Sequence, residues 1–151
     1  MHCQSSIKIL SWACLKEKFR PSTAKFETVI ENLNGLGFQD ASYLEDKLNL
    51  IETIMPAQNR YRFTIDPIAE YMAAVALVDQ LKDNANEWNT FLSEARSKEG
   101  SPVAIRGFML AVRDCCLVFC NEIGIPSFVF QELVEFTGLK PERNWDLRFH
   151  E

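Results

Sequence analysis

Apolar residues recur at helical spacing along most of this 151-residue chain, and this periodicity restricts the fold more than any other feature. Its stripes predict helices that begin near residues 5, 22, 40, 66, 86, 101 and 127. The stretch 60–65 differs, because it alternates and places Tyr61, Phe63 and Ile65 on one face, as in a half-buried strand. With the β-branched segment 49–55 before it, this stretch predicts a β-hairpin.

Three helices followed by a two-stranded wing are the order of a winged helix. The sequence therefore predicts a mostly α fold with a small β-hairpin, in which a winged-helix-like part, residues 1–65, is continuous with an α-helical bundle. Residues 66–138 are expected to form this helical extension and to share one core with the first part. Residues 139–151 mix proline, charge and isolated aromatics, which predicts a loosely packed tail.

Local signals predict how several helices begin and which aromatics they bury. Asp66 is the expected N-cap of the helix after the hairpin, with a proline at the first helical position. The Ser-Pro pair at 101–102 repeats this arrangement before a helix that is apolar on most faces and is therefore expected at the centre of the fold. Asp40 is the expected cap of the third helix. Phe63 and Tyr71 are predicted core residues.

The net charge is −5 and is unevenly distributed. Residues 1–65 carry eight basic and seven acidic side chains, whereas residues 66–151 carry eight and fourteen. This acidic second half disfavours nucleic acid and anionic membranes as partners. The apolar runs are too short to cross a membrane, and the first 15 residues lack the features of a signal peptide. We therefore expect a cytoplasmic location and no membrane partner.

The five cysteines are an odd set, and Cys115, Cys116 and Cys120 lie within one apolar run. Without an export signal, this pattern predicts reduced, buried thiols rather than disulfides. Cys116 and Cys120 share a helix face, but a structural zinc site needs four ligands. No CxxC pair or nearby histidine supplies the others. We therefore expect no metal site.

The usual residues of acid–base and nucleophilic catalysis are scarce. The histidines are His2 and His150, one near each end of the chain. The sequence holds no G-x-x-x-x-G-K-[S/T] loop that would cradle phosphates. We therefore expect no catalytic residues, no cofactor and no enzyme activity.

The stretch 60–74, RYRFTIDPIAEYMAA, resembles the winged-helix end of NACHT-type (STAND-class) signalling NTPases. In that family a strand of the pattern aromatic-x-Phe-x-His leads into a helix with Glu-Tyr and small residues. The matching positions are Phe63, Glu70, Tyr71, Ala73 and Ala74. The preceding segment 43–52 is similar to the family's helix and first wing strand. The segment 107–116 looks like the helical extension of bacterial, especially cyanobacterial, members.

This resemblance implies a role as well as a fold. The family's histidine, which approaches the nucleotide phosphates in the closed state, is replaced by Ile65, which has no hydrogen-bonding group in its side chain. The family's ATP-binding domain would precede residue 1, so the chain is expected to be part of a longer or split protein. The resemblance thus implies a non-catalytic regulatory and protein-interaction module that lacks the NTPase domain and acts in signal transduction. Its partner would be an NTP-binding domain in the same or another chain.

The resemblance also selects the residues expected to contribute structurally or at an interface. The family-motif residues are Phe63, Ile65, Asp66, Glu70 and Tyr71, and the candidate wing contacts are Arg60 and Arg62. Two other functions are weighed against this one. A small DNA-binding transcriptional regulator would use the third helix, but segment 40–48 has three acidic residues against Lys47 and would repel DNA. A stand-alone helical scaffold would dimerise through an apolar face of helix 101–123.

Overall fold

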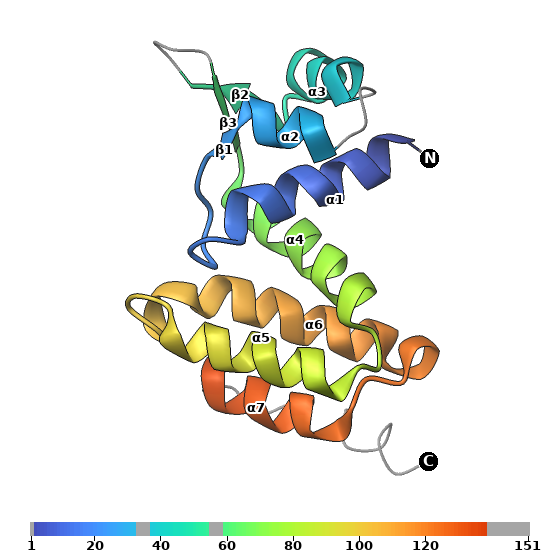
Figure 1. The fold of residues 1–151 in the computed structure, drawn as a ribbon, viewed down its shortest axis with the longest axis vertical. Helices are drawn as coiled ribbons and strands as arrows, with labels where there is room; N and C mark the ends of the chain where they lie inside the picture. The colour runs from blue at the N-terminus through green and yellow to red at the C-terminus, as the bar shows by residue number, and fades with distance from the viewer. Residues whose placement is uncertain (1, 33–36, 55–58, 139–151) are drawn as a thin grey trace.

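The structure is a computed structural model that describes residues 2–32, 37–54 and 59–138. In chain order its elements are α1 (His2–Leu15), β1 (Ala24–Lys25), α2 (Phe26–Asn32), α3 (Gly37–Asp46), β2 (Ile51–Thr53), β3 (Arg60–Phe63), α4 (Asp66–Leu81), α5 (Ala85–Ser97), a 3-10 turn (Val103–Ile105), α6 (Arg106–Ile123) and α7 (Ser127–Thr137). Figure 1 shows α1, α2, α3 and the sheet at one end, α5, α6 and α7 at the other, and α4 between them. The predicted mostly α fold with a small β element is confirmed.

The sheet of the described residues has the order β1-β3-β2, and both strand pairs are antiparallel. The predicted helix start near residue 22 is wrong, because residues 24–25 pair with Tyr61 and Arg60 instead. The amide of Phe26 then donates to the carbonyl of Asn59 at 2.8 Å. The second edge of β3 thus holds this segment extended, and α2 begins only at Phe26.

The third helix begins earlier than the sequence suggests. α3 starts at Gly37, so Asp40 lies inside the helix and the predicted N-cap there is wrong, because residues 37–39 already have helical backbone. Residues 55–58, between the two strands of the predicted hairpin, lie outside the described residues, as does the predicted tail 139–151.

Strand β3 leads into α4 through Thr64 and Ile65. Ile65 is the N-cap, with an extended backbone (φ −130°, ψ 111°), and Asp66 is the first helical residue. The predicted cap at Asp66 is therefore wrong by one position, because extended backbone continues through Ile65. The predicted inward orientation of Ile65 is also wrong, since the alternation of the strand ends at Phe63 and Ile65 is 51% exposed.

The helices of the second half are mostly bounded as predicted. The side chain of Asn84 accepts hydrogen bonds from the amides of Asn86 and Glu87 at 3.1 and 3.2 Å and so caps α5. Gly124 ends α6 in the left-handed region, which glycine adopts without strain. The predicted helix start at 101–102 is wrong, because one 3-10 turn intervenes before α6 begins at Arg106.

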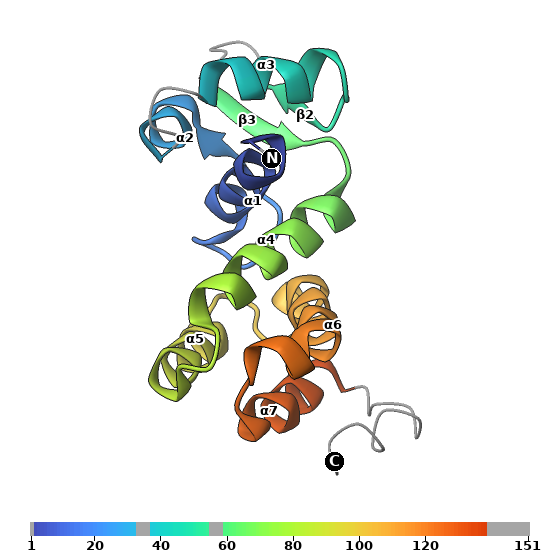
Figure 2. The same ribbon diagram turned by 90° about the vertical axis from the view of Figure 1, so that its right-hand side faces the viewer.

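Helix α4 packs against α1 and against α6, which lie on its two sides in both views (Figures 1 and 2). Ala69, Ala73 and Ala74 are at most 1% exposed, and their small side chains let both neighbours approach closely. The predicted burial of Tyr71 is wrong, because alanines form much of the buried surface of α4 and Tyr71 lies outside it at 45% exposure.

Aromatic rings connect the two ends of the molecule. The ring of Phe19, in the turn after α1, lies 5.2 Å from that of Phe91 on α5 and 5.5 Å from that of Phe108 on α6. Trp12 of α1 lies 6.2 Å from Phe108. Phe108 is fully buried, in agreement with the predicted central position of this helix. The hydrophobic core accordingly extends from α1 to α7 among the described residues.

Candidate interaction surface

The family-motif residues lie together, at the end of β3 and on the first half of α4. Phe63 is buried, as predicted for a core aromatic. Ile65, Asp66 and Tyr71 are exposed, and we call these three residues the junction surface. Ile65 lies at the N-cap of α4 and Asp66 is its first residue, whereas Tyr71 lies in the second turn of the helix. Isolated apolar residues are normal on a protein surface, and Ile65 and Tyr71 are the exposed large apolar side chains of the motif.

Glu70 is partly buried, and its carboxylate lies against α6. A Cβ atom added to Gly107 would collide with Oε2 of Glu70, so the carboxylate occupies the space that a side chain at position 107 would need. Gly107 is the second residue of α6. The positive end of that helix dipole favours an acidic group nearby. The motif glutamate therefore forms a contact between α4 and the first turn of α6.

Burial raises the pKa of the Glu70 carboxyl above its ordinary value, and the neighbouring Asp66 raises it further. No basic side chain of the described residues forms an ion pair with Glu70. Burial and the nearby Asp66 thus place a half-buried acid in an environment that disfavours its charged form.

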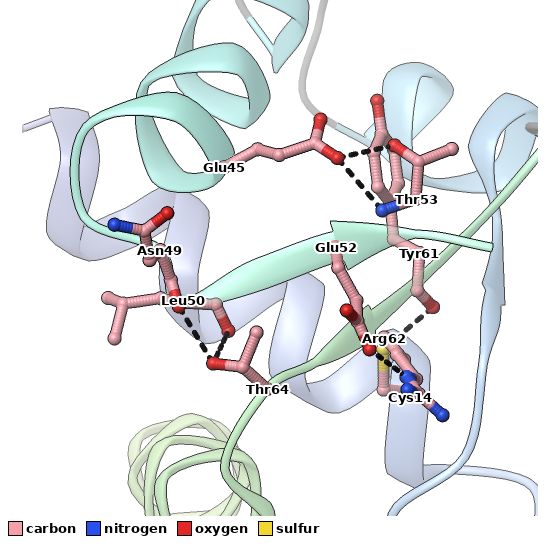
Figure 3. A network of polar contacts seen from close by, with 9 residues as sticks. All are labelled: Cys14, Glu45, Asn49, Leu50, Glu52, Thr53, Tyr61, Arg62 and Thr64. Carbon is pink, nitrogen blue, oxygen red and sulfur yellow. Dashed lines mark hydrogen bonds and ion pairs between the residues drawn. The ribbon is translucent and has the colours of Figure 1, made fainter.

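The candidate wing contacts are engaged within the fold. Nε of Arg60 donates to Oγ1 of Thr23 at 2.6 Å, which ties β3 to the segment before β1. Arg62 forms an ion pair with Glu52, its direct cross-strand partner on β2 (Figure 3). Arg62 remains exposed, whereas Arg60 is partly buried. Both guanidinium groups therefore already have polar partners within the fold.

A second polar contact, missed by the sequence analysis, fixes α3 to the wing. Oε1 of Glu45 accepts hydrogen bonds from the amide and the hydroxyl of Thr53 at 2.9 and 2.8 Å (Figure 3). An acidic residue in the last turn of a helix opposes the helix dipole. That unfavourable position was the one local sign that Glu45 has a specific partner. At the opposite end of the β2–β3 pair, the hydroxyl of Thr64 donates a hydrogen bond to the carbonyl of Asn49 at 2.7 Å.

A hollow of about 260 Å³ lies beside the junction surface. Its lining comes from the segment before β1, the end of β3 and the start of α4: Pro21, Ser22, Thr23, Arg62, Phe63, Asp66 and Ala69. It contains one cation and one carboxylate, so its charge selects neither anionic nor cationic small molecules.

The thiols of the described core are protonated at neutral pH. Burial raises the pKa of Cys14 and of Cys115 to about 12, and it raises that of Cys116 further. Cys14, Cys115, Cys116 and Cys120 are free, and the first three are buried, as predicted. The thiolate is the nucleophile and the metal ligand, so these buried thiols have no such reactivity at neutral pH. Cys3 lies among the residues whose side chains are not described.

Within residues 2–32, 37–54 and 59–138, no three His, Cys, Asp or Glu side chains come together as a potential metal site. None of the helices in these ranges combines the length and apolar character needed to cross a bilayer.

Comparison with known proteins places one part of the chain. No curated protein and no solved structure matches the chain significantly. Residues 97–141 match the family described as NACHT C-terminal Helical domain 4. The match takes in the end of α5 and all of α6 and α7, and it includes Gly107, against which Glu70 packs. Residues 97–141 are thus similar to a NACHT-associated helical domain.

Proposed function

We propose that the chain is a regulatory and protein-interaction module of a NACHT-type signalling NTPase and that it performs no catalysis itself. The observation that carries the proposal is the match of residues 97–141 to a NACHT-associated family, directly beside the motif 60–74. These two segments are in contact through Glu70 and Gly107. The motif and the match lie in different segments, so two separate signals support a NACHT-associated module. Its architecture would be a winged helix, of bacterial type, followed by its helical extension.

The module would act mechanically. An NTP-binding domain would dock on the junction surface in one state and leave it in another, which is a two-state docking equilibrium. Ile65 and Tyr71 would supply apolar contacts, and Asp66 would pair with a basic group of the partner. Because Ile65 replaces the histidine, the docked module would supply no hydrogen bond from this position to nucleotide phosphates.

Site-specific photo-crosslinking in cells of the native organism tests this proposal. A benzophenone side chain is placed at Tyr71, 45% exposed, and in a matched control at Val118, 61% exposed on α6. The crosslink from position 71 should capture a protein or domain whose sequence holds a phosphate-binding loop, and position 118 should not. Capture of the same partner from both positions, or of partners without such a loop, would contradict docking at the junction surface.

Calorimetry on the isolated chain tests the non-catalytic part of the proposal. Neither ADP nor Mg·ATP should bind with micromolar affinity, and no phosphate should be released from ATP. Tight nucleotide binding accompanied by hydrolysis would overturn the proposed role.

A further inference from the structure

A groove of about 590 Å³ separates the exposed sides of α1 and α4, at a distance along α4 from the junction surface. Six of its lining residues come from α1 and the turn after it, Ser5, Lys8, Ile9, Trp12, Ala13 and Lys16. Ala76, Asp79 and Gln80 of α4 form the other wall. None of these residues belongs to the motif 60–74, so the groove is a separate surface.

Ile9, Trp12 and Ala13 give the α1 wall of the groove an apolar part. Trp12 is partly buried through its contacts with Phe19 and Phe108, but its indole N–H makes no hydrogen bond to a described residue. The other indole of the described core, that of Trp88, donates to the carbonyl of Lys82 at 2.9 Å. Tryptophan with one apolar face buried and a free N–H is a common anchor at protein interfaces.

The groove is basic at the end of α1. Lys8, Trp12 and Lys16 follow each other at intervals of four residues, so the two lysines lie about 12 Å apart along one face. Lys8 is paired with Asp79 at 2.7 Å, whereas Lys16 has no ion pair among the described residues. Lys18 and Arg20 follow in the exposed turn, also without ion pairs there.

The charge around this end contrasts with that of the rest of the molecule. Residues 5–25 contain five basic side chains and one acidic one, whereas residues 66–151 are acidic overall. Lys8 and Asp79 neutralise each other across the groove, so its unbalanced positive charge comes from Lys16, with Lys18 and Arg20 following in the sequence. A partly apolar wall with an unpaired lysine at its end is complementary to a helix that carries a carboxylate beside an apolar stripe. We propose that the groove between α1 and α4 binds an acidic amphipathic helix of a partner protein, with apolar side chains on Ile9 and Trp12 and a carboxylate at Lys16.

The test uses the full chain and a synthetic helical peptide of about 15 residues, roughly 22 Å long. The peptide carries two glutamates eight residues apart with leucines between them, and a control peptide carries lysines in their place. Isotope-edited NMR should place the shifted amides in α1 and α4, and the control peptide should not bind. Titration should give a Kd in the micromolar range that rises with salt, because the contact is partly electrostatic.

Two charge reversals make the test specific. Lys16→Glu should raise the Kd about tenfold, whereas Lys25→Glu, an equal change at an exposed lysine in β1, should change it less than twofold. Equal losses in both variants would show general charge attraction and overturn the proposal, as would amide shifts confined to other elements. It would also fail if phosphatidylserine vesicles bound in a Lys16-dependent manner while the acidic peptide did not, since the surface would then face a membrane.

Discussion

Gly107 lacks a side chain at the point where a side chain would displace the carboxylate of Glu70. Glu70 lies on α4 and Gly107 lies 37 positions later on α6, so their contact determines how α4 is placed on the matched region. The carboxylate is the far end of a flexible side chain, and it can therefore rotate away when the space is filled. A substitution at position 107 should consequently alter the contact rather than prevent folding.

A double-mutant cycle measures this contact. Alanine in place of a helical glycine usually stabilises by about 0.5–1 kcal/mol. In the Glu70→Ala background, Gly107→Ala should give this full gain in the free energy of unfolding in urea. In the wild type the gain should be cancelled or reversed, because Glu70 must move. Additive effects of the two substitutions would show that the residues do not interact.

Glu70 also predicts how stability depends on pH. Its pKa is raised in the folded state, so above the ordinary value of 4.5 the folded protein binds more protons than the unfolded one. The stability that this group contributes is therefore fully present below that value and is lost as the pH rises through the folded pKa. Glu70→Gln should remove this loss, so its unfolding free energy should fall less than that of the wild type between pH 4 and pH 7. Identical pH profiles of the two proteins would contradict the inferred burial of the charge.

At the scale of elements, the wing is held to α3 by Glu45 and Thr53. Glu45→Ala removes the acceptor of two hydrogen bonds, at a cost of about 1–2 kcal/mol. The amide of Thr53 should then exchange with deuterium much faster, whereas Glu27→Ala, an exposed change on α2, should leave it protected. Unchanged protection of Thr53 in the first variant would mean that its amide is shielded by the sheet alone.

Helical periodicity predicted the elements whose large side chains face inward. In α5 the buried residues Trp88, Phe91, Leu92 and Ala95 are those that the stripe identifies. In α4 the same reasoning misplaced Tyr71, because alanine contributes little to a hydrophobic pattern although alanines form much of the buried surface. Strand β1 has two residues and no pattern of its own, and it exists because β3 offers it an edge.

The candidate site could be predicted only in part, for a related reason. The motif residues lie at the end of β3 and on α4, and Phe63 is buried as expected. Partners distant in sequence leave no local sign, so the contact of Glu70 with Gly107 emerges only from the three-dimensional arrangement. The exposure of Ile65 likewise depends on where β3 ends and α4 begins.

At the scale of the whole molecule, the rings of Phe19, Phe91 and Phe108 join the turn after α1 to α5 and α6. Phe108→Ala should reduce the free energy of unfolding by about 3–5 kcal/mol, the usual cost of emptying a buried phenylalanine site. The loss should appear in one transition, at the same urea concentration by circular dichroism and by tryptophan fluorescence. Val118→Ala, at an exposed site on the same helix, should cost less than about 0.5 kcal/mol. Two separate transitions would show that the ends unfold independently.

The buried alanines of α4 limit which substitutions these positions can accept during evolution. Ala69, Ala73 and Ala74 occupy buried positions on a helix that borders both α1 and α6. A larger side chain at these buried positions would overpack the contacts of α4 with its neighbouring helices. In related sequences these positions should therefore vary only among alanine, glycine and serine, even where the surface residues of the β2–β3 hairpin and of α7 differ.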